Sequence, residues 1–197
     1  MFNNHGVIVN VPPRKSKAEA MAATQLALRT TLWPGVSDSE LWSRKTAKGF
    51  ATVPRTLPMI MNIADSFTKN TPVSSVYLDL WCRMRDEGFV KLDKPAEMAM
   101  AAGFMTARGP GIWASRLDLL ETHGFISLAP GAHGPRSFAL LFNPYRVILA
   151  KREQIDKRLF NALLDQALAI GVEDLTGPSA EAAGPTLSQI SPKKEPG

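Results

Sequence analysis

The stretch ARGPGIW, at residues 107–113, holds the residue types best suited to binding an anion through the backbone. A glycine-rich turn that leads into a helix presents free N–H groups, and the helix dipole adds partial positive charge there. The nucleotide-binding loops that use this chemistry continue with a lysine and a hydroxyl residue, and neither follows here. We therefore expect no nucleotide site at this turn.

The other potentially reactive residues do not fall into a catalytic or metal-binding pattern. Three histidines and the single cysteine stand at no spacing typical of a metal site: His5, His123, His133 and Cys82. Cys82 lies within the apolar stretch YLDLWCRM, so we expect a small buried side chain rather than a nucleophile. The nearby acidic residues are spaced like a solvated helix edge, not a catalytic pair: Asp79, Asp86 and Glu87. Since phosphate-binding, dinucleotide-binding and nucleophile-elbow motifs are also missing, we expect no enzyme, no cofactor and no metal.

The composition is typical of a soluble globular protein. The chain has 197 residues, of which 45 % are hydrophobic, enough to build one sizeable core. A single cysteine excludes an internal disulfide framework and fits a reducing compartment. No apolar stretch reaches the ~18 residues of a membrane span, and the basic residues near the N-terminus follow its apolar run, the reverse of a secretory signal. We expect a cytoplasmic protein without membrane contact.

The formal net charge of +5 is concentrated in the N-terminal third of the chain. Residues 1–58 hold eight Lys or Arg and three Asp or Glu, whereas residues 59–150 hold nine and eight, and residues 151–197 hold six and seven. A basic arm beside a nearly neutral domain is a common way to bind a polyanion such as nucleic acid. Solvation of the segment explains the same charge, so charge alone does not decide between the two.

A helix is predicted near the start of this basic region. Ser16 and Glu19 have the spacing of a capping box, and the alanine-rich run that follows ends at WPG, residues 33–35. A single helical turn is expected at SDSELW, residues 37–42. Trp33 and Trp42 stand beside basic residues, where they would either stack on bases or pack on the domain. We favour packing, because a buried tryptophan contributes a large apolar area.

The spacing of apolar residues predicts the remaining elements, with glycines and prolines at their ends. The predicted order is helix 57–67, helix 74–87, strand 89–92, helix 95–102, helix 110–123, strand 125–130, turn 131–137, strand 138–144 and helix 147–170. In the helix at residues 110–123, one face carries Trp113, Leu117 and Leu120, which we expect to be buried.

The last predicted helix, at residues 147–170, has apolar side chains on two faces. One stripe holds Ile155, Leu159 and Leu163, and the other holds Phe160, Leu164, Ala167 and Leu168. This pattern predicts either a homodimer or packing of both faces on the helix at residues 57–67 of the same chain. After residue 171 the tail is polar and rich in proline and glycine, so we predict disorder.

The order of elements over residues 75–144 resembles the winged helix-turn-helix superfamily of DNA-binding domains. The most telling part is RLDLLETHGFISL, residues 116–128, which resembles the end of a recognition helix running into the first wing strand. AEMAMAAGF, residues 96–104, is similar to the preceding helix, and GAHGPRS is similar to a wing tip. The turn at residues 104–109 is longer than the three or four residues of the simplest motif, and Gly109 and Gly111 bring no side chains to read a base.

The resemblance implies a mainly α fold with a small β-ribbon (α+β) and helical N- and C-terminal extensions. A basic arm with one helix would occupy residues 1–55, the winged-helix domain and C-terminal helix residues 56–171, and a disordered tail residues 172–197. The implied function is binding of double-stranded DNA as a transcriptional regulator, or as a plasmid or phage replication or maintenance protein. A winged helix that binds another protein is the alternative.

The resemblance also implies which residues contact DNA. The turn, the recognition helix and the wing would contribute Thr106, Arg108, Ser115, Arg116, His133 and Arg136. The basic arm would add phosphate contacts from Arg14, Lys15, Lys17, Arg44, Lys45 and Lys48. A homodimer through residues 147–170 would place two reading helices on a two-fold site.

Overall fold

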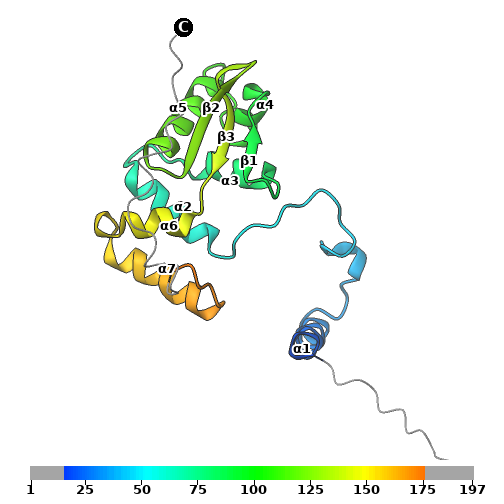
Figure 1. Cartoon of the computed structure of the whole chain (residues 1–197). Coiled ribbons are helices and arrows are strands. Elements are labelled where there is room, and N and C mark those ends of the chain that lie inside the picture. Colours follow the sequence, from blue (N-terminus) through cyan, green and yellow to red (C-terminus); the bar gives the residue numbers. More distant parts are fainter. Residues whose placement is uncertain (1–15, 176–197) are drawn as a thin grey trace, which may run out of the picture. The chain divides into compact units, whose positions relative to one another are not determined.

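A computed structural model describes residues 16–175 and divides the chain into two units, Met1–Gly49 and Phe50–Gly197 (Figure 1). The sequence placed this boundary at residue 55. The predicted phosphate contacts Arg14 and Lys15 lie outside the described residues, as do residues 176–197 of the predicted disordered tail. Over the described part of the chain, no helix is long and apolar enough to span a membrane.

The N-terminal unit is built around helix α1 (Lys17–Leu32). The predicted capping box is present, because the Ser16 N–H donates to Glu19 Oε2 at 2.7 Å and the Glu19 N–H donates to Ser16 Oγ at 3.2 Å. The helix ends at Leu32 with Trp33 as its C-cap, and the predicted single turn follows as the 3-10 helix η1 (Asp38–Glu40). Local sequence signals were therefore sufficient to place both helices.

The tryptophans of the N-terminal unit are exposed within that unit, and their predicted packing on the domain stays a prediction. Trp33 is 60 % exposed and Trp42 is 71 % exposed. Helix α1 has no buried residue, and its large apolar side chains are all more than half exposed: Met21, Leu26, Leu28 and Leu32. A core needs at least two packed layers, and the described part of this unit has one long helix and one short turn.

The C-terminal unit is a mixed α and β fold with a three-stranded antiparallel sheet. Its elements are α2 (Leu57–Phe67), α3 (Ser74–Arg83), β1 (Phe89–Lys91), α4 (Pro95–Ala101), α5 (Gly109–Thr122), β2 (Ile126–Gly131), β3 (Gly134–Leu141), α6 (Pro144–Ala150), η2 (Arg152–Gln154) and α7 (Lys157–Ala169). The strand order is β1-β3-β2, so β3 is central and forms a hairpin with β2 (Figure 1). The predicted α+β class and the predicted element order up to β3 are confirmed.

One core joins the helices to the inner face of the sheet. Its largest fully buried side chains include Leu57 and Ile60 of α2, Tyr77 and Leu80 of α3, Leu117 and Leu120 of α5, and Phe125 and Ile126 at the start of β2. Cys82 is exposed, contrary to prediction. It lies two residues after the buried Leu80, about 200° around the helix axis, and so on the opposite face of α3.

The predicted single helix over residues 147–170 is wrong, because the chain forms α6, η2 and α7 there. Ile155 is extended, and the Asp156 carboxylate caps a new helix by accepting the N–H of Arg158 at 2.9 Å. The buried face of α7 includes Phe160 and Leu163, and α7 packs against α2 of the same chain. Leu175 is 6 % exposed, so packing continues beyond residue 171, where disorder was predicted.

Candidate functional site

The turn between α4 and α5 fixes the N-terminus of α5. The Phe104 N–H donates to the Ala99 carbonyl at 2.8 Å, and the Gly109 N–H donates to the Thr106 carbonyl at 2.8 Å. Gly109 is required by packing, since a Cβ there would lie 2.2 Å from the Phe104 carbonyl oxygen. On the other side of α5, Trp113 is 2 % exposed within the core, as predicted together with Leu117 and Leu120.

The opposite side of the first two turns of α5 faces solvent and carries three predicted DNA contacts. We call Thr106, Arg108, Gly111 and Ser115 the α5 face; all four are exposed. Arg108 forms no ion pair with any described residue. The Ser115 hydroxyl donates to the Ile112 carbonyl at 2.8 Å, so its proton is already used within the helix. A Cβ on Gly111 would find no atom within 4 Å, so packing does not require glycine there.

Arg116 packs on the turn rather than extending from the helix. Its guanidinium carbon lies 6.0 Å from the centroid of the Phe104 ring, within range of a cation–π contact. Its Nε is buried and has no hydrogen-bond partner among the described residues. The predicted role of Arg116 as a DNA contact therefore has less geometric support than that of Arg108.

Arg136 is not on a flexible wing tip, which corrects the sequence-based placement. Strand β3 begins at Gly134, so the loop of the hairpin is short and Arg136 lies within the strand. Its Nε and Nη2 donate to the two carboxylate oxygens of Asp118 on α5, at 2.7 and 2.6 Å. These hydrogen bonds raise the pKa of Arg136 above its ordinary value. The pair ties the hairpin to α5 and largely neutralises the charge of Arg136.

His133 lies in the short loop of the same hairpin and is exposed. Its backbone N–H donates to Ser137 Oγ at 3.1 Å, and the Ser137 hydroxyl donates to the Gly134 carbonyl at 2.9 Å. The loop is therefore held by its own hydrogen bonds. The His133 side chain remains available at the tip of the hairpin, where it was predicted.

The N-terminal unit contributes a compact basic turn, residues 43–48. The Ser43 carbonyl accepts the N–H groups of Thr46 and Ala47 at 3.1 and 2.7 Å. This turn exposes all three of its predicted phosphate contacts, Arg44, Lys45 and Lys48, and Lys17 in the first turn of α1 is also exposed. No Asp or Glu occurs between residues 41 and 64. The turn thus exposes three cations in a stretch of the chain that contains no acidic residue.

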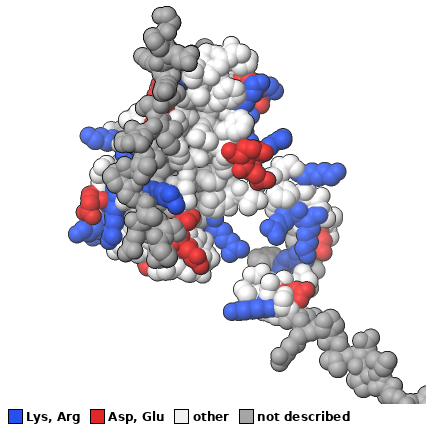
Figure 2. All heavy atoms as spheres, viewed as in Figure 1, with Lys and Arg blue, Asp and Glu red and all other residues white. Residues whose placement is uncertain are grey.

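Charge over the C-terminal unit is mixed. Figure 2 shows Lys and Arg interspersed with Asp and Glu on the visible face of this unit. The two acidic residues of α5, Asp118 and Glu121, lie in its second half, and each accepts a hydrogen bond from a described residue. Asp118 binds Arg136, and Glu121 Oε1 accepts the Leu128 N–H at 2.6 Å. The first half of α5, from Arg108 to Arg116, contains no acidic residue.

Two methionines beside the α4–α5 turn were not singled out from the sequence. Met105 is 79 % exposed and Met100 is 59 % exposed. Methionine at an exposed position gives an adaptable apolar surface that suits protein partners. Met100 lies two residues after the buried Met98, about 200° around α4, so helical spacing could have placed it on the outer face. Met105 lies in the turn, where helical spacing gives no information.

No protein-family model, curated protein or solved structure matches this chain. Within residues 16–175, no group of three His, Cys, Asp or Glu side chains is placed to hold a metal ion. The function is therefore inferred from the α5 face, the hairpin and the basic turn.

Proposed function

We propose that the C-terminal unit is a winged helix-turn-helix domain that binds duplex DNA, with α5 as the recognition helix and the β2–β3 hairpin as the wing. The element order α3, β1, α4, α5, β2, β3 and the strand order β1-β3-β2 support this assignment. So does the close packing of α4 on α5, with β2 following α5 directly.

The observation that carries the proposal is the chemistry of the α5 face. Its first two turns lack acidic residues, expose Arg108, and have no Cβ at Gly111. A helix N-terminus adds partial positive charge from its backbone N–H groups. A glycine that packing does not require also lets a phosphate backbone approach the helix closely.

In this proposal Arg108 makes the main contact from α5, to a guanine edge or to a phosphate. Thr106 and Ser115 contribute oxygen atoms at the rim, while Asp118 and Arg136 hold the hairpin at a fixed angle to α5. The basic turn supplies contacts with phosphates that do not depend on sequence. Arg136 is thus a positioning residue for the wing rather than a primary DNA contact.

The test is binding of a labelled duplex, followed by fluorescence anisotropy from about 50 mM to about 200 mM salt. Arg108→Gln should weaken binding by about 1–3 kcal/mol and relax selectivity at one base pair if the contact is to a base edge. If the contact is to a phosphate, all duplexes weaken equally and the salt slope falls by about one. The control is Arg158→Gln, an exposed cation on α7, which should leave the affinity unchanged.

A second set of variants tests the basic turn. Replacing Arg44, Lys45 and Lys48 together by Gln should reduce the log–log salt slope by about 0.9 for each phosphate contact that is lost. No preference between sequences should change. A variant with the parent slope would show that the turn does not contact DNA.

A second candidate function is binding of a protein partner through the α4–α5 turn, and the exposure of Met100 and Met105 favours it. The interspersed charge in Figure 2 points the same way. The two functions differ in one measurement: a DNA-binding protein must bind some duplex in low salt. Absence of binding to every duplex under those conditions rejects the first proposal and leaves the second.

A further inference from the structure

The junction between η2 and α7 forms a hollow that no part of the DNA-binding proposal uses. The 3-10 helix η2 ends at Gln154, Ile155 is extended, and Asp156 starts α7. Ile155 and Phe160 occupy the two positions of a hydrophobic staple, one before the cap and one four residues after it. Each is 6 % exposed, so the floor of the hollow is apolar and continuous with the core.

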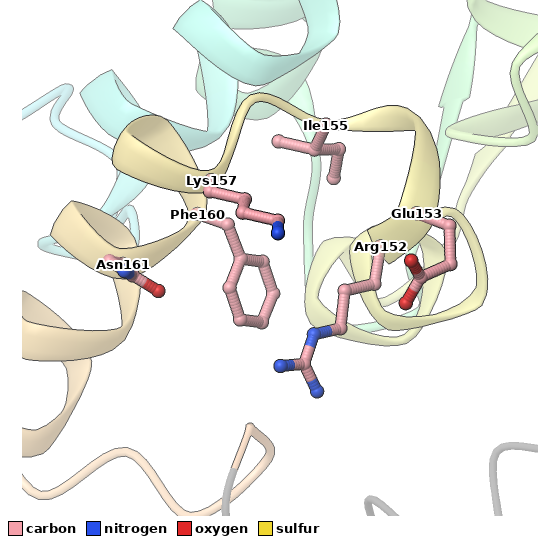
Figure 3. A pocket seen from close by; sticks show the side chains of 6 residues that line it. All are labelled: Arg152, Glu153, Ile155, Lys157, Phe160 and Asn161. Carbon is pink, nitrogen blue, oxygen red and sulfur yellow. The ribbon is translucent and has the colours of Figure 1, made fainter.

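The hollow has a volume of about 380 Å³, and we call it the α7 pocket; its lining consists of Arg152, Glu153, Ile155, Lys157, Phe160 and Asn161 (Figure 3). Figure 3 shows Arg152 reaching from η2 and Lys157 from α7 toward the space beside the Phe160 ring. The guanidinium carbon of Arg152 lies 4.9 Å from the centroid of that ring. Small-molecule pockets have volumes of about 300–1,000 Å³, so the α7 pocket has room for a compact ligand.

The side chains that line the α7 pocket carry two positive charges and one negative charge, Arg152 and Lys157 against Glu153. Neither Arg152 nor Lys157 forms an ion pair with a described residue. The Asp156 carboxylate, which is close in sequence, is occupied by the N–H groups of Arg158 and Leu159 at 2.9 and 3.3 Å. Two cations directed toward one apolar floor repel each other, and an anion between them relieves that repulsion. Asn161 adds an amide that can donate to the same anion.

We propose that the α7 pocket binds a small organic anion, with one carboxylate or phosphate group between Arg152 and Lys157 and a flat apolar group against Ile155 and Phe160. An arginine guanidinium can bind either group through two parallel hydrogen bonds. Glu153 in the lining disfavours a second anionic group on the ligand. This selects ligands with a single anionic group over polyanions such as DNA.

The experiment is isothermal titration of the full chain with four probes: benzoate, phenyl phosphate, inorganic phosphate and benzyl alcohol. Benzoate or phenyl phosphate should bind, and comparison of the two identifies the preferred anionic group. Inorganic phosphate lacks the apolar group and benzyl alcohol lacks the charge, so both should bind at least about tenfold more weakly, the effect of losing one favourable contact of roughly 1.4 kcal/mol.

Variants then locate the site. Arg152→Gln and Lys157→Gln should each weaken binding of the better aromatic anion by about tenfold or more, as for a lost hydrogen bond to a charged group. Arg158→Gln is the matched control: it removes the neighbouring exposed cation, which does not line the pocket, and should bind like the parent. Thermal unfolding of each variant checks that the fold is retained. Asn161→Ala removes the amide that donates to the anion and should also weaken binding of the better aromatic anion.

Three outcomes overturn the proposal. In the first, neither aromatic anion binds at millimolar concentration. In the second, inorganic phosphate binds as well as phenyl phosphate, or Arg158→Gln weakens binding as much as the pocket variants, so that only general surface charge is involved. In the third, Arg152→Gln lowers the affinity for duplex DNA and leaves the aromatic anions unaffected, which makes the cations part of a DNA surface.

Discussion

Gly111→Ala should make the protein more stable and a weaker DNA binder, and this opposition separates structure from function on α5. Glycine inside a helix is less favourable than alanine by roughly 0.5–1 kcal/mol, because it loses more backbone freedom on folding. The new Cβ would meet no atom within 4 Å. The free energy of unfolding should therefore rise by roughly 0.5–1 kcal/mol, measured by urea denaturation.

Binding should change in the other direction if α5 approaches DNA closely. Adding a methyl group to a close-packed contact costs about 1–3 kcal/mol, so the affinity for a duplex should fall by about 5-fold to 150-fold. Fluorescence anisotropy on the same protein preparation gives this value. The combination of higher stability and lower affinity cannot come from partial unfolding.

Gly109→Ala provides the contrast two residues earlier. A Cβ at Gly109 would lie 2.2 Å from the Phe104 carbonyl oxygen, so the α4–α5 turn must move and both stability and binding should fall. If Gly111→Ala raises stability and leaves DNA affinity intact, the first turn of α5 does not approach a DNA backbone. That result would refute the assignment of α5 as the recognition helix.

Three further predictions follow from the same region. Trp113→Ala should lower the free energy of unfolding by about 3–5 kcal/mol in urea denaturation, because this side chain is 2 % exposed in the core. A double-mutant cycle on Asp118 and Arg136 should give a coupling of about 0.2–1 kcal/mol, since both side chains of this bidentate pair are partly exposed; zero coupling would mean that the pair does not hold the hairpin. Burial, and to a smaller extent the charge of Lys151, lower the pKa of His123 in the folded protein below its ordinary 6.5. As the pH falls, His123 therefore binds a proton in the unfolded chain before it does so in the folded protein. Its contribution to the free energy of unfolding is complete above pH 6.5 and is lost as the pH falls through the lowered pKa, and this pH dependence should be absent in His123→Gln.

The parts of the fold that depend on local signals were predictable from the sequence. The capping box of α1, the buried face of α5 and the strands after it follow from spacing within a few residues. The break before α7 was also encoded locally. Asp156 is a favourable helix cap, and Ile155 and Phe160 have staple spacing, but the continuous apolar pattern concealed the boundary.

The candidate site depended more on contacts between distant residues. Arg136 and Asp118 are 18 residues apart, and their ion pair forms only because β3 returns beside α5. Exposure of Trp33 and Trp42 depends on the absence of a second layer around α1 in the described part of the unit, which residue type does not reveal. Cys82 could have been placed correctly, because it lies off the helical face that contains Tyr77 and Leu80.

The lack of any buried residue in α1 affects how any unfolding experiment on this protein is interpreted. In the described part of the N-terminal unit no second layer covers α1, and a helix of 16 residues on its own is only marginally stable in water. We therefore expect α1 to lose its structure gradually on warming, while the C-terminal unit melts cooperatively. Far-ultraviolet circular dichroism sums both processes. Fluorescence is split between Trp33 and Trp42, which are already exposed, and the buried or half-buried Trp81 and Trp113. The two probes should therefore give different melting curves, and a two-state treatment applies to residues 50–175 rather than to the whole chain.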